Sequence, residues 1–466
     1  MKESSQGLNE PLIGGNNNDD STLAASSTTL NDDCNDADAA GGGIKQSTST
    51  QHNTNQKKIS GFVLAIIVFF NACGGPFGIE PALKAAGNLY AIIGISVMPF
   101  IWSLPEAIIT YEMSSKYPCA SGGVRWVEEA FGETFGLLVG YLGWISGVTN
   151  NASYPVLFLS YVHRQFFPEL TATDNMFLHY IILAVISIML AFVNYRGLDV
   201  VGKASILIFF ISMLPFLLMV IIGIPKVDPT KWTETPSGEV EIFDDDALDQ
   251  TGWFPAATIA GIAFRPFVNT LYWNFNGFDQ ASHFSTTIVS KVAYRNGIYG
   301  SLVMASCAYL LPVLIATGAT NIEQDQWKEG AFAIAATDIA GKWLGNWIVV
   351  SAGISLLAQF FSEMSSDSMQ LQGMAERGQL PSLFGKKSRH DTPTYSLLLG
   401  LAVILLLLPF SFGFIIELSN FSFCLALTIE FLAFAQLLIR KGGKLLLIVS
   451  LHTYLILLLL LPNVVF

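Results

Sequence analysis

The sequence predicts an all-α membrane protein with about eleven spanning helices, two of them broken inside the membrane. The chain is 52% hydrophobic and 13% charged, whereas soluble domains carry about 25% charged residues. Apolar runs of about 20 residues, the length that crosses a bilayer, recur along it. Two of these runs contain glycine-rich interruptions, at residues 74–78 and 273–279. Together these observations predict a polytopic bundle rather than a soluble domain.

The first 58 residues predict a disordered cytoplasmic tail. They are polar, acidic and nearly free of aromatic residues, so they cannot bury enough apolar surface to fold. They also lack the short apolar core with a cleavage site that marks a secretory signal.

Eleven spans are expected after the tail. They cover residues 59–83, 91–113, 129–161, 176–194, 199–224, 260–288, 297–319, 346–374, 394–411, 413–438 and 444–464. With the tail inside, most Lys and Arg residues fall in inside loops, which predicts a cytoplasmic amino terminus. The predicted organisation is a first five-helix repeat (59–224), an acidic extracellular loop (225–255), a second repeat (256–438) and a C-terminal membrane helix (439–466).

The acidic loop allows two interpretations. A solvated surface loop is the simpler one. The alternative is that its negative charge concentrates cations near the outer mouth of a pathway.

The two interruptions predict a binding site at the middle of the membrane. Gly74, Gly75, Pro76 and Gly78 break the first span, and the segment 273–279 breaks the sixth. Non-helical backbone at membrane depth is tolerated only where it lines a protein cavity. Breaks at corresponding positions of two five-helix halves are typical of inverted-repeat transporters. The free NH and carbonyl groups at the broken ends would face the site.

Carboxylates at membrane depth need a reason, because each costs about 2.5–3.5 kcal/mol on insertion scales. The candidates are Glu80, Glu106, Glu112, Asp279, Glu363, Asp367, Glu417 and Glu430. We expect Glu80 and Asp279, next to the breaks, to line a cavity. Glu106, Glu363 and Asp367 are candidates for coupling or gating, and the other three for helix bridging or helix ends.

An acidic cavity favours a cationic substrate or a proton-coupling step. Gln359, Glu363 and Asp367 are spaced four residues apart and share one helix face. Tyr272 and Trp273, at the second break, could present aromatic faces to a cation. Trp144 and Tyr154 could do the same, although packing is the simpler interpretation for them.

Other chemistries lack support in the sequence. The five cysteines show no paired metal spacing, and no nucleophile–base constellation or phosphate loop is present. We therefore expect no metal, no cofactor, no enzymatic activity, no nucleic-acid partner and no obligate protein partner.

Several motifs resemble the amino acid–polyamine–organocation superfamily. Residues 111–148 are similar to its second-to-third helix region, and NYRGL (194–198) and FNGFD (275–279) match its pattern. GGPFGIE (74–80), WSLPEA (102–107), NTLYWNFNGFDQAS (269–282) and EMSSDSMQLQGMAERGQLP (363–381) resemble the polyamine uptake transporters of plants and protists. The similarity covers about residues 59–440.

This resemblance implies a leucine-transporter-type fold and proton-coupled uptake of putrescine, spermidine or spermine. It implies a substrate site lined by Gly74, Gly75, Gly78 and Glu80 from the first helix, and by Trp273, Asn274, Asn276 and Asp279 from the sixth, with Tyr272 adjacent. Two features depart from the family. Residues 285–297 lack its acidic-x-Asn-Pro pattern, which affects the expected cytoplasmic gate, and eleven spans replace the usual twelve.

The alternative function is a proton-coupled transporter of cationic or neutral amino acids, and a transporter-like nutrient receptor is a third hypothesis. Proton coupling itself is permitted rather than required. Each charge gains about 2.3 kcal/mol per 100 mV on entry, so a polycation could be driven by potential alone. The plasma membrane is the expected location, with an internal membrane second.

Overall fold

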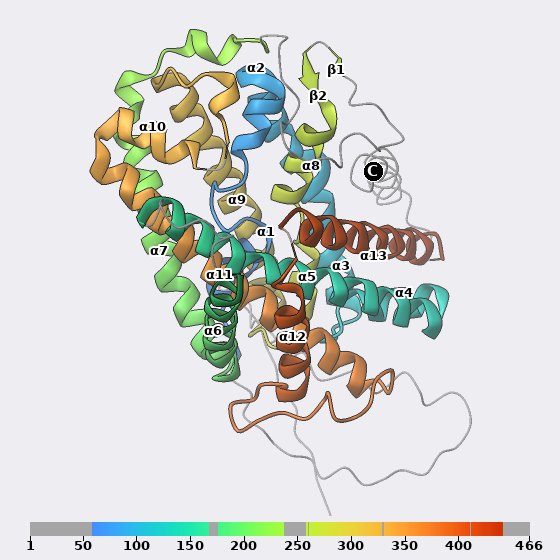
Figure 1. Ribbon diagram of the computed structural model, residues 1–466. Coiled ribbons are helices and arrows are strands. Elements are labelled where there is room, and N and C mark those ends of the chain that lie inside the picture. The colour runs from blue at the N-terminus through green and yellow to red at the C-terminus, as the bar shows by residue number, and fades with distance from the viewer. Residues whose placement is uncertain are drawn as a thin grey trace, which may run out of the picture.

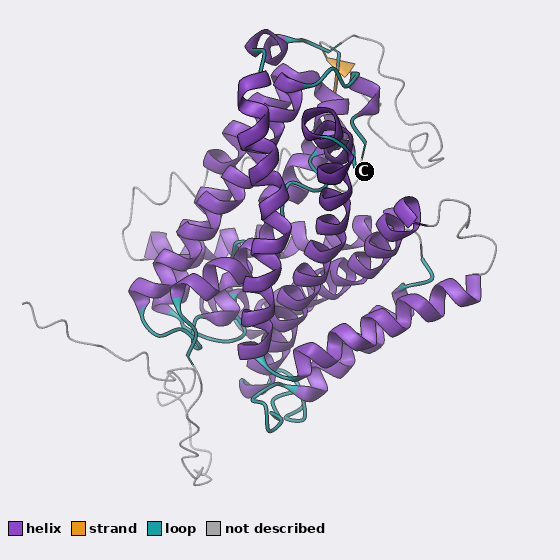
Figure 2. Ribbon diagram, turned by 90° about the vertical axis from the view of Figure 1, so that its left-hand side faces the viewer, coloured by secondary structure: helices purple, strands orange, loops and turns teal. Residues whose placement is uncertain are grey.

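The computed structural model describes residues 58–166, 176–236, 258–259, 261–328, 330–410 and 412–440. Most of them are helical, and a single small hairpin lies at one end of the bundle (Figures 1 and 2). The predicted tail up to residue 57, most of the acidic loop and the predicted span 444–464 lie outside the described residues. The five-part division of the chain therefore stays a prediction.

The first half of the chain begins with the expected broken helix. Helix α1 (Gly61–Ala72) ends before the glycines, and α2 (Glu80–Met98) begins after them and turns at Gly87, whose φ is 69°. The π-turn η2 (Pro99–Ser103) and α3 (Leu104–Lys116) complete the second span. The chain continues through α4 (Gly123–Phe131), α5 (Glu133–Phe166), α6 (Met176–Tyr195) and α7 (Leu198–Gly223).

The second half of the chain follows short 3₁₀ turns (Ile224–Lys226 and Pro229–Thr233). Strands β1 (Thr258–Ile259) and β2 (Ile262–Ala263) pair antiparallel, with Thr258 opposite Ala263. The broken span is α8 (Phe264–Phe275) followed by the 3₁₀ helix η6 (Asp279–Phe284). The remaining helices are α9 (Lys291–Ala319), α10 (Ala331–Ala340), α11 (Lys342–Glu376), α12 (Thr394–Leu407) and α13 (Phe412–Arg440), with a 3₁₀ turn at Gln324–Gln326 before α10.

Two helices, α4 and α10, were not expected. Helix α4 is too short to span, and it buries Val124, Trp126 and Val127 while its charged residues stay outside. Gly132, with φ 97°, separates it from α5. The predicted span 129–161 is therefore shifted, because α5 begins at Glu133. The 10-residue α10 is apolar but lies between α9 and α11 as a separate short helix.

The bundle is arranged around α1, α5 and α11. Helix α5 packs against α11, α13 and α4, while α1 packs against α9, α7 and α11 (Figure 1). The segment before α1 is tied to the segment after η6, because Ile59 NH donates to Thr287 O at 2.9 Å and Val289 NH donates to Ile59 O at 3.2 Å. Six stretches of the described chain are long and apolar enough to cross a membrane. Both broken helices are thus held inside the bundle.

Candidate functional site

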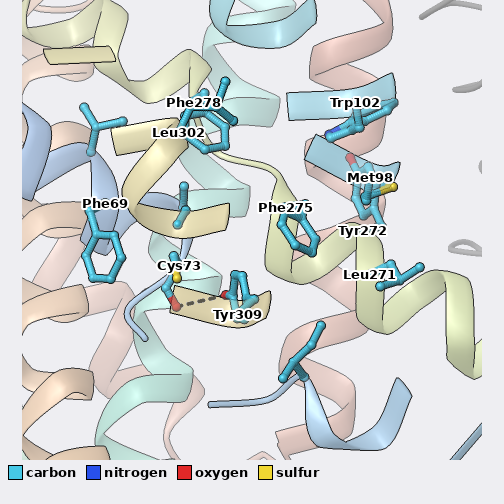
Figure 3. Packing of buried hydrophobic residues seen from close by; sticks show 14 of the residues in the cluster. Phe69, Cys73, Met98, Trp102, Leu271, Tyr272, Phe275, Phe278, Leu302 and Tyr309 are labelled. Carbon is cyan, nitrogen blue, oxygen red and sulfur yellow. Dashed lines mark hydrogen bonds between the residues drawn. The ribbon is translucent and has the colours of Figure 1, made fainter. Parts of the chain in front are cut away.

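The backbone at the first break is stabilised by side chains from other helices. Tyr309 of α9 donates to Cys73 O at 3.1 Å (Figure 3), and Ser355 of α11 donates to Gly74 O. Gly74, Gly75 and Gly78 have φ values of 66°, 118° and 81°, a region open to glycine without steric cost. The glycines therefore allow the open backbone, and hydroxyl groups from α9 and α11 satisfy carbonyls that a continuous helix would have paired.

The second break is stabilised by side chains from η2 and α3. Ser103 donates to Phe275 O at 2.6 Å. Glu106 Oε1 accepts two backbone hydrogen bonds, from Gly277 NH and Asp279 NH, each at 3.1 Å. A single carboxylate oxygen thus neutralises the positive end of the broken helix.

The two breaks touch one another. Asn274 of α8 donates through Nδ2 to Gly78 O at 2.9 Å. A Cβ on Gly277 would lie 3.1 Å from Asn71 O, and one on Gly78 would lie 2.5 Å from the Trp273 ring. Segments about 200 residues apart in sequence therefore share one small region.

A cavity of about 40 Å³ opens beside the contact between the breaks. Its lining comes from α1, α5, α8, η6, α9, α11 and α13 and from the two breaks. The lining residues are Asn71, Ala72, Cys73, Ser146, Asn150, Tyr154, Trp273, Asn274, Asn276, Gln280, Tyr309, Gln359, Glu363, Ser419, Asn420 and Phe423. Glu363 is the one carboxylate among them, and none of these lining residues is cationic.

Glu363 is the centre of a polar group in the cavity. Tyr154 donates its hydroxyl to Glu363 Oε2 at 2.7 Å, and Asn150 donates through Nδ2 at 2.9 Å. Asn150 also donates to the Tyr154 hydroxyl at 2.8 Å. Because both partners donate, they position the carboxylate without neutralising it.

Four of the lining amide side chains have an oxygen atom without a hydrogen-bond partner among the described residues. Asn150 Nδ2 donates to Glu363, and Asn274 Nδ2 donates to Gly78 O and to Thr270 O. These partners are acceptors, so they fix which end of each amide carries the nitrogen. The oxygens of Asn150, Asn274, Gln280 and Asn71 have no hydrogen-bond partner in the described chain. The cavity therefore presents acceptors to whatever it binds.

Glu80 lies outside this lining. It is fully buried, and its Oε2 accepts from Gly78 NH at 2.8 Å while its Oε1 accepts from Gly330 NH at 3.2 Å. Gly330 is the residue before α10. The carboxylate therefore joins the start of α2 to the loop that carries α10.

The remaining predicted residues are distributed around the cavity. Trp273, Asn274, Asn276 and Glu363 line it, whereas Gly74, Gly75, Gly78, Tyr272, Asp279, Glu106 and Asp367 are not among its lining residues. Tyr272 is fully buried; it accepts from Cys424 Sγ at 3.2 Å and packs its ring on Trp102 at 5.1 Å (Figure 3). Asp367 lies against Gly147 of α5, and its Oδ2 has no partner among the described residues.

Sequence reasoning missed several lining residues. Asn71, Asn150, Gln280, Tyr309, Ser419 and Asn420 were not singled out as site residues. A signal existed for Asn150, because it lies four residues before Tyr154, on the same helix face, inside a predicted span. Of the expected bridging acids, Glu112 pairs with Lys116 at 2.9 Å, Glu430 lies against Gly123 of α4, and the Glu417 side chain is outside the description.

Comparisons with known proteins agree with this architecture. The profile of the family described as amino acid permease matches residues 61–463. The chain is 38% identical to the polyamine transporter RMV1 of Arabidopsis thaliana over 84% of this chain and 75% of that protein. It is 37% identical to the polyamine transporter PUT1 of Oryza sativa subsp. japonica over 83% of this chain and 68% of that protein.

A solved structure shares the fold. A Na⁺-coupled sialic acid symporter in a substrate-bound, outward-open state superimposes with a TM-score of 0.54 at 11% identity, over 87% of this chain and 90% of that one. The predicted leucine-transporter-type fold with broken first and sixth helices is confirmed, and the protein is a multi-pass membrane protein.

Proposed function

Since this chain belongs to the amino acid permease family, we propose that it imports polyamines together with protons by alternating access. One observation carries the proposal: the cavity offers a carboxylate and several free amide oxygens, and no lining residue is cationic. An ammonium group has three donors and no acceptor. Such a lining complements an amine and disfavours an anion.

The same geometry argues against the amino acid alternative. A carboxylate substrate would need the backbone NH groups at the broken helix ends. Three of these groups, at Gly78, Gly277 and Asp279, already donate to Glu80 or Glu106. The donors that would bind a substrate carboxylate are therefore occupied by the protein's own acids. The curated relatives that match at 37–38% identity are described as polyamine transporters, which supports the same conclusion.

The size of the cavity supports alternating access. About 40 Å³ has room for a few waters, since each needs about 10–15 Å³ of such volume. A diamine would not fit until the helices around the breaks move apart. The described conformation then corresponds to a closed stage of the cycle.

Transport would run inward across the plasma membrane with the amino terminus in the cytoplasm. The asymmetry of Lys and Arg between alternate loops supports this orientation. An inside-negative potential adds about 2.3 kcal/mol per substrate charge per 100 mV.

The test is uptake of labelled putrescine in a cell that lacks its own polyamine transport. We expect saturable uptake that unlabelled spermidine and spermine compete for and that arginine and leucine do not. A protonophore should reduce it. Competition by arginine or leucine with none by spermidine would favour the amino acid alternative, and binding without accumulation would favour a receptor. Glu363→Gln should abolish uptake, and Glu112→Gln, a partly exposed acid paired with Lys116, should not.

A further inference from the structure

Glu106 and Asp279 form a second acidic group, separate from the cavity lining. Glu106 is fully buried in α3 and Asp279 begins η6. Glu106 Oε1 accepts from the backbone NH of Asp279 at 3.1 Å, so the two carboxyl groups lie close together. No cationic side chain of the described chain pairs with either of them.

Each carboxyl group of the pair also has one oxygen atom without a hydrogen-bond partner among the described residues. Glu106 Oε2 and Asp279 Oδ1 are buried and receive no hydrogen bond from any described donor. Like charges this close, away from water, cannot both ionise at low cost. The titratable groups facing the pair are Tyr272 of α8, Tyr294 of α9, Glu363 of α11 and Glu430 of α13. None of these supplies a positive charge.

A file of polar groups leads from the pair to one end of the bundle. Thr110 and Ser114 follow Glu106 at four-residue intervals on α3, so the three share one helix face. Thr110 and Ser114 are buried, at 1% and 3% exposure, and their hydroxyls make no hydrogen bond with any described residue. Buried hydroxyls without partners are uncommon in folded proteins.

The file continues to the α9 end. The ring of Tyr294 in α9 lies 6.3 Å from that of Tyr111 in α3, and its buried hydroxyl has no hydrogen-bond partner among the described residues. Lys291, exposed at the start of α9, donates to Ser115 O at 3.4 Å. This end carries Lys116 and Lys291, which the charge asymmetry places on the cytoplasmic side.

We propose that Glu106 and Asp279 share the transported proton and release it to the cytoplasm along Thr110, Ser114 and Tyr294. This inference rests on the proposed import of polyamines with protons. The proton bound by the pair is the one lost to cytoplasmic water, so the pair cycles between one shared proton and none, and the high cost of the doubly ionised pair drives uptake of the next proton. The file supplies hydroxyls that can both donate and accept along the way.

The geometry also links the proton to the helix break. Glu106 Oε1 binds the backbone of Gly277 and Asp279, and hydrogen bonds to an ionised carboxylate are about twice as strong as those to a neutral one. Protonation of Glu106 therefore weakens the hydrogen bonds between α3 and the second break. Release of the proton restores their strength. Proton occupancy would thus bias the movement of η6 against α8.

The experiment uses the full-length protein in vesicles with labelled putrescine as the probe. Exchange of internal for external putrescine needs no net proton release, whereas uptake driven by a pH gradient does. We measure both, with the membrane potential clamped at zero, and follow lumen acidification with a trapped pH dye. For one proton per substrate, one pH unit should give the wild type about tenfold accumulation.

Glu106→Gln keeps the oxygen that binds Gly277 and Asp279 but cannot release a proton. We expect it to exchange putrescine, to lose the tenfold accumulation and to acidify no lumen. Thr110→Val should exchange normally and slow gradient-driven uptake. Glu112→Gln, on the same helix but paired with Lys116, is the matched control and should behave as wild type.

The outcomes separate the two proposals. Wild-type vesicles that neither exchange nor accumulate putrescine would overturn the proposed function itself. Gradient-driven accumulation by Glu106→Gln at the wild-type level would overturn the proton site and leave polyamine import intact. If Glu106→Gln loses putrescine exchange as well, the proton site is tested with Asp279→Asn and Thr110→Val instead. Full gradient-driven accumulation in both of these variants would overturn the proposal, and its loss with exchange retained would support it.

Discussion

Glu80 Oε1 accepts a hydrogen bond from the backbone NH of Gly330 at 3.2 Å, across 250 residues of sequence. Its other oxygen accepts from Gly78 NH at 2.8 Å. Glu80 is also the first residue of α2, where a negative charge is favoured by the helix dipole. One carboxylate thus ties the break, the half-helix after it and the loop before α10 into a unit that must move together.

Glu80→Gln should therefore slow transport more than it weakens substrate binding. An amide can accept through only one of its two terminal atoms, so one hydrogen bond to a charged group is lost, a change of about 1.5–3 kcal/mol. We expect the maximal putrescine uptake rate to fall about tenfold or more while the concentration for half-maximal uptake changes little. The measurement is initial uptake rate against concentration.

Asp325→Asn is the control for Glu80→Gln, because Asp325 is an exposed acid in the same loop before α10. It should leave both kinetic values unchanged. A large rise in the half-saturating concentration for Glu80→Gln, at an unchanged maximal rate, would instead make Glu80 a direct ligand of the amine.

Tyr154→Phe should weaken polyamine binding through Glu363. The Tyr154 hydroxyl donates to Glu363 Oε2 at 2.7 Å, and losing a hydrogen bond to a charged group changes the free energy by about 1.5–3 kcal/mol. We expect the half-saturating putrescine concentration to rise about tenfold, with normal protein in the membrane. Tyr180→Phe, whose hydroxyl contacts Leu405 O at 3.4 Å, is the control. An unchanged value for Tyr154→Phe would argue that Glu363 does not touch the amine.

The breaks were predictable from sequence and the roles of the acids were not, for a physical reason. Glycines and a proline act on the backbone locally, so their effect can be read where they stand. The partners of Glu80 and Glu106 come from distant segments, at Gly330 and Gly277. Adjacency to a break suggested that Glu80 lines a cavity, but its oxygens are used by backbone NH groups.

The membrane-spanning helices were also predictable where the length of an apolar run was the evidence. The two short helices α4 and α10 escaped because neither reaches the roughly 20 residues that mark a crossing. The amide residues that line the cavity were not predicted, because an isolated Asn in an apolar run forms no recognisable sequence pattern. Only the spacing of Asn150 and Tyr154 gave a local hint of their shared partner.

The turn after α7 should keep its structure in acidic medium. Asp228 accepts from the Thr230 backbone NH at 3.0 Å and from its hydroxyl at 2.7 Å, and these hydrogen bonds lower the pKa of the Asp228 carboxyl. A group with a lowered pKa stabilises the fold above its unfolded value and loses this effect only as the pH falls through the folded value. The cap therefore persists at about pH 5, well above the ordinary Asp pKa of about 4.

Limited proteolysis of the purified protein at pH 7 and pH 5 tests this cap. Wild type should resist cleavage around residues 228–233 equally at both values. Asp228→Ala should be cleaved faster at both, whereas Asp228→Asn retains an oxygen acceptor and should resemble wild type. Resistance that is lost between pH 7 and pH 5 in wild type would contradict the assigned cap.

Gly277→Ala should damage both folding and transport, because the two breaks meet at this residue. Gly277 has φ 94°, a conformation that costs an L-residue about 1–2 kcal/mol, and the added Cβ would lie 3.1 Å from Asn71 O. Gly132→Ala is the matched control: its φ is 97°, but nothing lies within 4 Å of the new Cβ. Both variants pay the backbone strain, and only Gly277→Ala also pushes the breaks apart. We expect a larger fall in melting temperature and a severe loss of putrescine uptake for Gly277→Ala alone. Equal effects of the two substitutions would mean that close contact between the breaks is not required for transport.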